Sequence, residues 1–159
     1  MKKLFVLLIV LSAFQVNAQN NSELLQHYKA YYKQMKSQGD VQGVINALTH
    51  LNILEPKVTT RDTLAGYYMN EGKYIQALNT IGIDMNNTDS DMAVEIKAVS
   101  LQALNQPEKA IEFYETLFKR KPNVNIAYEL ADLKIQTNDL VGARVHITYG
   151  EANTKDDMG

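Results

Sequence analysis

The feature that most constrains the fold of this chain is a repeat with a period of 33 residues. Residues that readily adopt a left-handed backbone conformation recur at this offset, at Gly39, Gly72, Asn105 and Asn138. Such residues close a helix before a tight turn. Small residues recur at the same offset on both sides of the turns, in the columns Ala65, Ala98, Ala131 and Ala77, Ala110, Ala143. Because small side chains let two helices approach closely, the period predicts a series of helical hairpins.

Each repeat is expected to contain two amphipathic helices. In the third repeat, Val94, Ala98, Leu101 and Leu104 recur at the spacing of one helical face. We predict eight helices, at residues 22–37, 41–54, 58–70, 74–85, 90–104, 107–120, 124–136 and 140–152. The repeats would occupy about residues 25–57, 58–90, 91–123 and 124–152, within a domain at residues 19–152 that is followed by a polar tail at 153–159.

The third repeat resembles the tetratricopeptide repeat (TPR) family in the residues that carry the family's pattern. These are Ala98, Leu101, Ala110, Tyr114 and Pro122. Two lysines, Lys97 and Lys134, stand where the pattern has a leucine and an aromatic residue. The resemblance implies an all-α fold, a right-handed α-α superhelix (solenoid) of about four TPR-like helical hairpins. It also implies a non-catalytic scaffold or adaptor that binds a protein or peptide partner.

The first 18 residues have the order of a secretory signal peptide. Two lysines precede the apolar run Leu4–Leu11, and Val16-Asn17-Ala18 offers a cleavage site after Ala18. An uncleaved membrane anchor is the alternative, although the apolar run is shorter than the roughly 20 residues that span a bilayer. Because the signal is short, begins with two lysines and precedes a sequence without cysteine, we expect an exported protein of the bacterial cell envelope, with the periplasm as its location. No second long apolar run follows.

The TPR resemblance also implies that the first helix of each repeat lines a concave groove for a partner segment. Carried over onto this sequence, the groove residues are Lys29, Lys33, Lys36, Asp62, Met69, Glu95, Val99, Tyr128, Asp132 and Ile135. The groove would be basic at one end and acidic with apolar patches beyond. It could thereby orient a segment that carries a carboxylate at one end and basic residues further along. The alternative is that these charges form an ordinary solvated helix face.

The last predicted helix carries an apolar stripe on an outward face. Val141, Val145 and Tyr149 follow one another at the i, i+4 and i+8 spacing of a single stripe. On the positions that would pack against a further repeat, the same helix has Arg144 and Glu151, which predicts that the array ends there. The stripe could join a second copy, as in a structural or assembly subunit, or contact a partner. Otherwise it is covered by a folded-back tail or tolerated on the surface.

The sequence contains little that points to catalysis or to a cofactor. It has no cysteine, its three histidines lack metal-ligand spacing, and no glycine-rich phosphate loop occurs. The net charge of −2 argues against nucleic-acid binding by bulk charge. Asp62, Glu95 and Asp132 could together support a carboxylate-based hydrolase, but nothing positions a third group around them. We therefore predict that the protein is not an enzyme and that it binds no cofactor and no metal.

Overall fold

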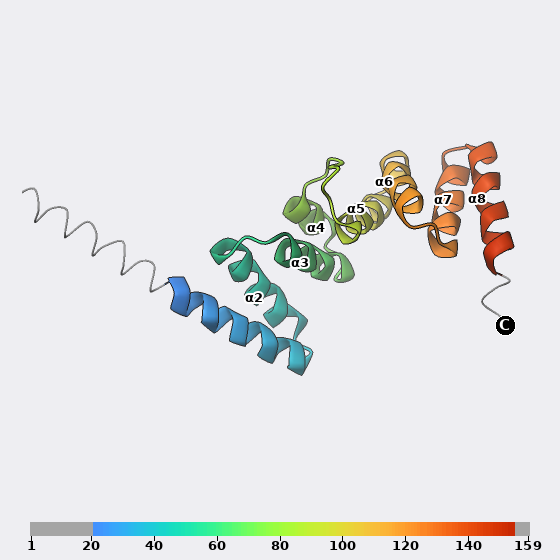
Figure 1. The fold of residues 1–159 in the computed structure, drawn as a ribbon. Helices are drawn as coiled ribbons and strands as arrows, with labels where there is room; N and C mark the ends of the chain where they lie inside the picture. Colours follow the sequence, from blue (N-terminus) through green and yellow to red (C-terminus); the bar gives the residue numbers. More distant parts are fainter. Residues whose placement is uncertain (1–20, 155–159) are drawn as a thin grey trace, which may run out of the picture. The chain divides into compact units, whose positions relative to one another are not determined.

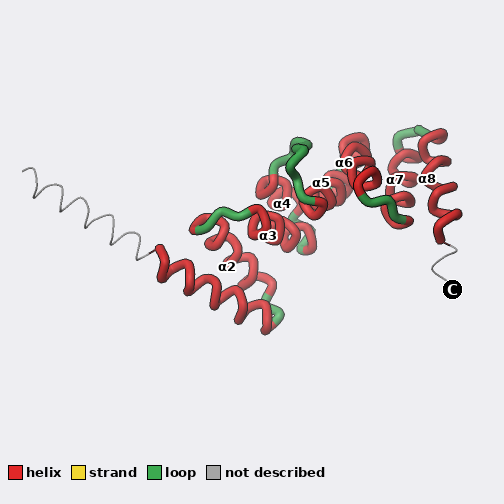
Figure 2. The backbone as a smooth tube through the Cα atoms, in the orientation of Figure 1, coloured by secondary structure: helices red, strands yellow, loops and turns green. Residues whose placement is uncertain are grey.

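The computed structural model describes residues 21–154, and all regular secondary structure in this range is helical (Figures 1 and 2). A helix at residues 21–38 is followed by seven others. These are α2 (Val41–Leu54), α3 (Val58–Asn70), α4 (Tyr74–Ile81), α5 (Asp91–Ala103), α6 (Pro107–Arg120), α7 (Val124–Gln136) and α8 (Leu140–Asn153). The prediction of an all-α chain is confirmed. The predicted signal peptide, at residues 1–18, and residues 155–159 of the predicted tail lie outside the described range.

The turn residues of the 33-residue period all have the backbone conformation that the sequence predicts. Gly39 and Gly72 have φ values of +71° and +70°, and Asn105 and Asn138 have values of +56° and +63°. Only glycine enters this region without steric cost, and asparagine is among the few other residues that visit it routinely. The same four positions therefore end a helix in each repeat.

The chain divides into two compact units, an N-terminal unit (Met1–Leu64) and a C-terminal unit (Ala65–Gly159). In the N-terminal unit, Met35 is buried and lies directly against Gly43 of α2, where an added Cβ would be 2.5 Å from the Met35 sulfur. The side chain of Asp40 accepts a hydrogen bond from the Gly43 backbone N–H and caps α2. Gly43 thus serves the close contact between the two helices rather than flexibility.

In the C-terminal unit each helix from α4 to α8 packs against the next one along the chain. The main core cluster draws on four helices, α4, α5, α6 and α7. Its buried members are Leu78, Val94, Ala98, Leu101, Ala110, Phe113, Tyr114, Leu117, Leu130 and Leu133. Ala98 and Ala110 are completely buried, as the small-residue columns of the repeat predict. This packing is what aligns α5 and α7 beside one another on α6.

The prediction of a helix at 74–85 is wrong at its C-terminal end. The helix α4 stops at Ile81 because Gly82 takes a left-handed φ of +81°. The connection that follows, residues 82–90, is held by Lys97, which is only 1% exposed. The Lys97 ammonium donates to the Asp84 carbonyl oxygen at 2.7 Å and to the Asp89 carboxylate at 2.5 Å. At position 97 the TPR pattern has a leucine, whereas this chain has a lysine whose charged group holds the connection in place.

Lys134, the second departure from the TPR pattern, also joins elements through its charge. Its ammonium donates to Glu115 of α6 at 2.8 Å and to Asp139 at 3.3 Å. Asp139 also accepts a hydrogen bond from the Gly142 backbone N–H and so caps α8. The two carboxylates raise the pKa of Lys134. One side chain on α7 therefore ties α6 to the start of α8.

We expect a half-buried histidine on α8, His146, to make the stability of the protein depend on pH. The His146 ring packs edge-on against Phe118 at 5.1 Å, and its Nδ1 atom has no hydrogen-bond partner among the described residues. Burial, and to a smaller extent the charge of Lys134, lowers the pKa of His146, whereas Glu115 and Asp139 oppose the shift. As the pH falls through 6.5, His146 therefore binds a proton in the unfolded chain before it does so in the folded chain. This difference lowers the free energy of unfolding.

We expect the wild-type protein to lose stability between about pH 7.5 and about pH 5.5, and the loss to be smaller in a His146→Leu variant. Urea unfolding followed by circular dichroism at both pH values measures the difference. The variant removes the titrating group but keeps an apolar side chain against Phe118. An equal loss in both proteins would assign the pH dependence to other groups.

Candidate functional site

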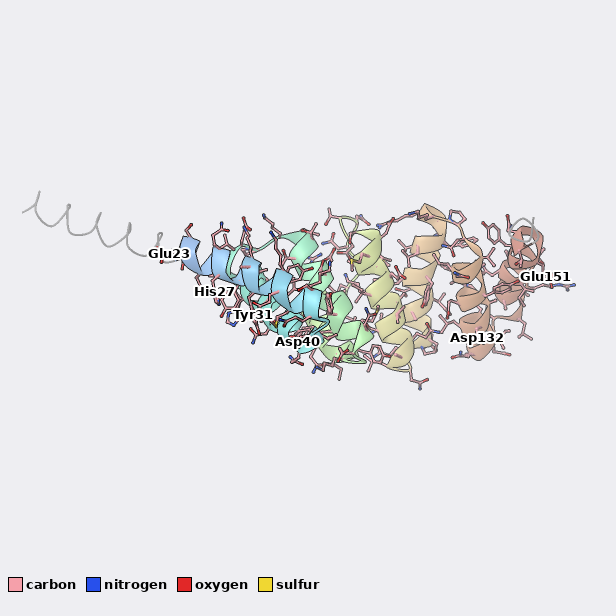
Figure 3. All side chains as sticks on the ribbon, turned by 90° about the horizontal axis from the view of Figure 1, so that it is seen from below. Glu23, His27, Tyr31, Asp40, Asp132 and Glu151 are labelled. Atoms are coloured by element: carbon pink, nitrogen blue, oxygen red, sulfur yellow. The ribbon has the colours of Figure 1, made fainter. Side chains whose placement is uncertain are left out.

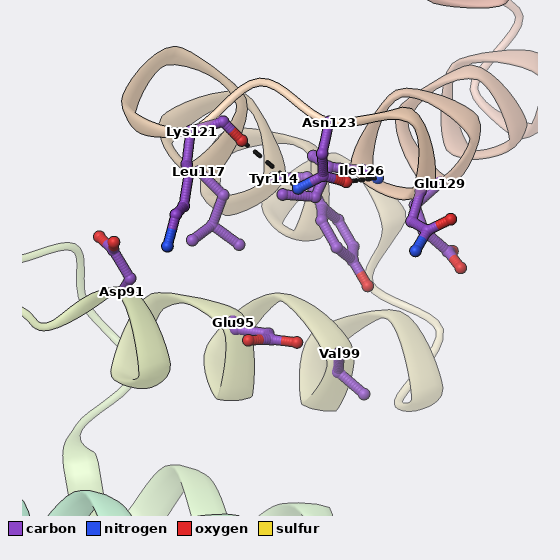
Figure 4. Close-up of a pocket in the computed structure, with 10 residues that line it drawn as sticks. Asp91, Glu95, Val99, Tyr114, Leu117, Lys121, Asn123, Ile126 and Glu129 are labelled. Atoms are coloured by element: carbon purple, nitrogen blue, oxygen red, sulfur yellow. Dashed lines mark hydrogen bonds between the residues drawn. The ribbon is translucent and has the colours of Figure 1, made fainter. Parts of the chain in front are cut away.

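The C-terminal unit contains a cavity of about 370 Å³ between α5, α6 and α7 (Figure 4). Residues from all three helices and from the connection between α6 and α7 line it. They are Asp91, Glu95, Val99, Tyr114, Leu117, Lys121, Asn123, Asn125, Ile126 and Glu129. Figure 4 shows Glu95 and Val99 on α5 facing Leu117 and Tyr114 of α6 across the cavity. The cavity therefore combines apolar side chains with three carboxylates, those of Asp91, Glu95 and Glu129.

A chain of hydrogen bonds fixes the polar groups on one side of this cavity. The Tyr114 hydroxyl donates to the Gln102 side-chain oxygen at 2.8 Å, and the Gln102 amide donates to the Glu129 carboxylate at 2.9 Å. The chain joins α6, α5 and α7. Burial raises the pKa of the Tyr114 hydroxyl, and the negative charges of Glu129 and Glu95 add to this effect. The hydroxyl thus keeps its proton and uses it to donate to Gln102.

The acidic residues of the cavity differ in how they are neutralised. Asp91 accepts a hydrogen bond from Arg120 at 3.1 Å in a salt bridge. Within residues 21–154, Glu95 and Glu129 form no salt bridge with any lysine or arginine. Lys121 lies at the Asp91 end of the cavity (Figure 4). The other end of the cavity carries an excess of negative charge.

The structure brings together only two of the predicted groove residues at this cavity, Glu95 and Val99. Met69 instead packs against the buried cluster of Ala65, Ala77, Ile81 and Ile96. The remaining predicted groove residues of this unit lie on α7 outside the cavity lining. They are Tyr128, Asp132 and Ile135.

The α7 residues outside the cavity have other contacts. The Tyr128 ring lies against Gly150 of α8, where an added Cβ would be 2.7 Å from the ring. Asp132 projects from the surface (Figure 3) and accepts a hydrogen bond from Gln136 at 2.9 Å. Ile135 is exposed. Tyr128 is therefore a packing residue between α7 and α8 as well as a surface residue.

The predicted basic end of the groove belongs to the N-terminal unit. Lys29 forms a salt bridge with Glu55 at 3.2 Å, and Lys57 pairs with the same carboxylate at 3.0 Å. Hydrogen bonds from Lys57 and Lys29 lower the pKa of Glu55. Lys33 is exposed, and the Lys36 ammonium lies 5.8 Å from the centre of the Tyr32 ring. Lys29 is thus partly neutralised within its own unit, whereas Lys33 is open to solvent.

Asp62 differs from the groove residue that the family pattern implies. Its side chain is buried, with 3% of the residue exposed, and it forms a salt bridge with Arg61 at 2.8 Å. Arg61 takes the place of an aromatic residue in the TPR pattern and supplies the compensating charge. A carboxylate in this state is a structural group rather than an open contact for a ligand.

The carboxylates suggested for acid–base chemistry are not assembled in the cavity. Glu95 lines it, but Asp132 of the same unit does not. Across residues 21–154, no group of three or more histidine or acidic side chains is placed to hold a metal ion. None of the helices described has the length and apolarity needed to cross a membrane.

The predicted outer stripe is present on α8 in two of its three members. Val141 is 81% exposed and Val145 is 64% exposed, and Leu140 beside them is also exposed. Tyr149 is half-buried instead, because its ring packs edge-on against Phe118 of α6 at 4.9 Å. Eight helical residues amount to more than two turns, so Tyr149 has rotated away from the stripe toward the core. The outer apolar face therefore consists of Leu140, Val141 and Val145, and this name is kept below.

Sequence reasoning missed most of the cavity lining. Tyr114 stands in the sequence analysis only as a residue of the TPR pattern, and Leu117 is not singled out there; both are buried at 4% exposure, and both also line the cavity. Glu129 follows Tyr128 and is not among the groove positions that the family pattern implies, yet it accepts a hydrogen bond from Gln102 of α5. The sequence feature that could have indicated the cavity is Gln102, a polar residue next to the core residue Leu101 and within reach of the Tyr114 hydroxyl.

The comparisons with known proteins agree with this architecture. No family model matches the chain, and no curated protein matches it significantly in sequence. Among solved structures, a MamA protein is 18% identical, with a TM-score of 0.72 over 84% of this chain and 75% of that one. MamA from Desulfovibrio magneticus RS-1 is 15% identical, with a TM-score of 0.66 over 92% of each chain.

A tetratricopeptide repeat protein from Parabacteroides merdae ATCC 43184 is 21% identical to this chain, with a TM-score of 0.69 over 82% of it. The match spans 54% of the Parabacteroides protein, so this chain corresponds to about half of its length. These similarities establish the fold. The chain is an all-α helical solenoid of the kind found in TPR proteins.

Proposed function

We propose, on the premise that the chain is a TPR-like helical solenoid, that it is a non-catalytic scaffold of the bacterial cell envelope. It holds a segment of a partner protein in the cavity between α5, α6 and α7. The observation that carries this proposal is the lining of that cavity, in which Val99, Leu117 and Ile126 offer apolar contact and three carboxylates offer polar contact. Binding sites commonly pair an apolar surface with a few fixed polar groups.

The location in the envelope rests on the sequence of residues 1–18. The charged start, the apolar run and the small residue at Ala18 support export and cleavage, which would leave Gln19 as the first residue. A scaffold in that compartment meets exported or membrane-attached partners.

A Val99→Trp variant tests whether the cavity is the working surface. Val99 is half-buried and lines the cavity, so an indole at this position would fill the space that a partner segment needs. We expect capture of the specific partner to fall by about tenfold or more, which corresponds to the loss of one well-packed anchor. The measurement is quantitative cross-linking and mass spectrometry of the tagged protein from the envelope of its native cell, with the mature N-terminus read from the same sample.

The matched control is Ile53→Trp, which adds the same ring to a residue of α2 that is 70% exposed. Both variants should keep the helical content and melting temperature of the wild-type protein. A partner captured equally by all three proteins would refute binding in the cavity. Recovery of the uncleaved chain from the cytoplasm would refute the envelope location.

A second candidate function is favoured by the outer apolar face of α8. A structural or assembly subunit would use Leu140, Val141 and Val145 to pair with another copy, because three neighbouring apolar side chains in water favour association. We expect a Val141→Glu/Val145→Glu double variant to halve the solution mass if the protein is a dimer. Light scattering after gel filtration measures the mass. An unchanged mass would remove this candidate.

A further inference from the structure

The cavity between α5, α6 and α7 has two carboxylates that form no salt bridge with the lysines and arginines of residues 21–154. Glu95 stands on α5 and Glu129 on α7, and both line the cavity. Asp91, in contrast, is paired with Arg120. A cavity of about 370 Å³ with two unpaired acidic groups attracts a positively charged group far better than a neutral or an anionic one.

The hydrogen-bond chain beside these carboxylates presents acceptors to the cavity. The O–H group of Tyr114 donates its hydrogen bond to the Gln102 side-chain oxygen, and the Gln102 amide in turn donates to the Glu129 carboxylate. The Tyr114 oxygen therefore has only lone pairs left for a ligand. Tyr114 is 4% exposed, so its oxygen is held in place by the core rather than by solvent. A ligand that supplies several hydrogen-bond donors satisfies this arrangement.

The apolar part of the cavity lining matches the stem of a long basic side chain. Val99 of α5 and Leu117 of α6 are apolar and line opposite sides of the cavity (Figure 4). Long basic residues pack their methylene groups on apolar surface while the charged head reaches polar groups. Arginine fits better than lysine because its planar guanidinium offers five donors in a fixed fork, enough for two carboxylates and a hydroxyl oxygen.

We propose that the cavity receives an arginine side chain of the partner segment, with its guanidinium between Glu95 and Glu129 and its stem on Leu117 and Val99. This inference rests on the proposed function, since it names the chemistry of the segment that the same cavity would hold. It assigns Glu95 and Glu129 to partner selection, and Tyr114, through Gln102, to the positioning of Glu129.

The test begins with selection of peptides from a random library displayed on phage, using the purified wild-type protein. We expect arginine to be enriched at one fixed position of the selected sequences. The best peptide is then synthesised with arginine and with citrulline, which has nearly the same shape but no charge. Replacing arginine by citrulline should weaken binding to the wild-type protein by about tenfold or more.

The same peptide pair is measured against a Glu95→Gln/Glu129→Gln variant. We expect the difference between arginine and citrulline to shrink to about twofold or less, because the charges that discriminate between them are gone. The control variant Glu112→Gln/Glu151→Gln removes two exposed carboxylates of the same unit outside the cavity and should keep the full difference. Free N-acetylarginine amide should not displace the peptide at equal concentration.

The outcomes separate this inference from the proposed function. Peptides that bind without a basic residue, or an arginine preference that survives in the Glu95→Gln/Glu129→Gln variant, would overturn the arginine site. The proposed function, binding of a partner segment in the cavity, would still stand if the Val99→Trp variant lost partner capture. Failure to select any peptide, together with partner capture that Val99→Trp leaves unchanged, would overturn both. Displacement by free N-acetylarginine amide would make the site one for a small molecule and would also overturn the inference.

Discussion

Replacing Asp89 by alanine is expected to destabilise the protein by about 3–5 kcal/mol, the range seen when one partner of a buried ion pair is removed. The Asp89 carboxylate pairs with Lys97, whose side chain is 1% exposed, and also accepts a hydrogen bond from the Asn86 backbone N–H at 3.2 Å. Without Asp89 the Lys97 ammonium would stay buried, with the Asp84 carbonyl oxygen as its remaining hydrogen-bond acceptor among the described residues and the Phe113 ring 5.8 Å away. Urea unfolding followed by circular dichroism measures the loss.

The control for this prediction is Asp91→Ala, two residues further along the chain. Asp91 is also in a salt bridge, with Arg120, but its side chain is 54% exposed. Water screens such a pair, so we expect a loss of about 1 kcal/mol or less. A Lys97→Met variant should lose less than Asp89→Ala, because methionine fills the site and Asp89 lies on a connection that can turn its carboxylate to water. Equal losses for Asp89→Ala and Asp91→Ala would show that burial adds nothing to this pair.

Replacing Leu101 by alanine is expected to destabilise the protein by about 2–5 kcal/mol, as leucine-to-alanine changes in packed cores do. Leu101 is completely buried and belongs to the cluster that α4, α5, α6 and α7 share. The cavity left behind would face several helices, which cannot all move to fill it. Chemical unfolding at a fixed pH measures the change, and the slope of the transition reports whether the helices still unfold together.

Leu140→Ala is the matched control for Leu101→Ala, because it removes the same atoms from a residue that is 61% exposed. We expect its stability to remain within about 0.5 kcal/mol of the wild type. A loss at Leu101 as small as that at Leu140 would mean that the core relaxes around the missing side chain. A large loss at Leu140 would instead point to burial of the outer apolar face in an assembly.

The helices could be predicted from the sequence because their boundaries depend on local chemistry. Asn105 and Asn138 take the left-handed conformation that the glycines of the earlier repeats also take, and this conformation ends the helix wherever it occurs. Pro107 begins α6, where its missing N–H costs no hydrogen bond. Each of these signals acts within a few residues of its position.

The remaining features depend on residues far apart in the sequence. The connection at residues 82–90 is ordered by Lys97 and by Arg120, whose guanidinium donates to the Asp89 carbonyl oxygen from 31 residues away. The cavity likewise depends on Glu129 meeting Gln102, which is 27 residues distant. Periodicity places such side chains on a helix face but leaves open which partner each one reaches.

The link that Lys134 makes between Glu115 and Asp139 has a consequence for local unfolding. The first turn of α8 is capped by Asp139, and this same carboxylate is held by a lysine that is also anchored to α6. Toward the other end of α8, the Tyr128 ring rests on Gly150. With contacts at both ends, α8 should open in one cooperative step rather than fray turn by turn. Its backbone amides would then share a single protection factor in hydrogen exchange.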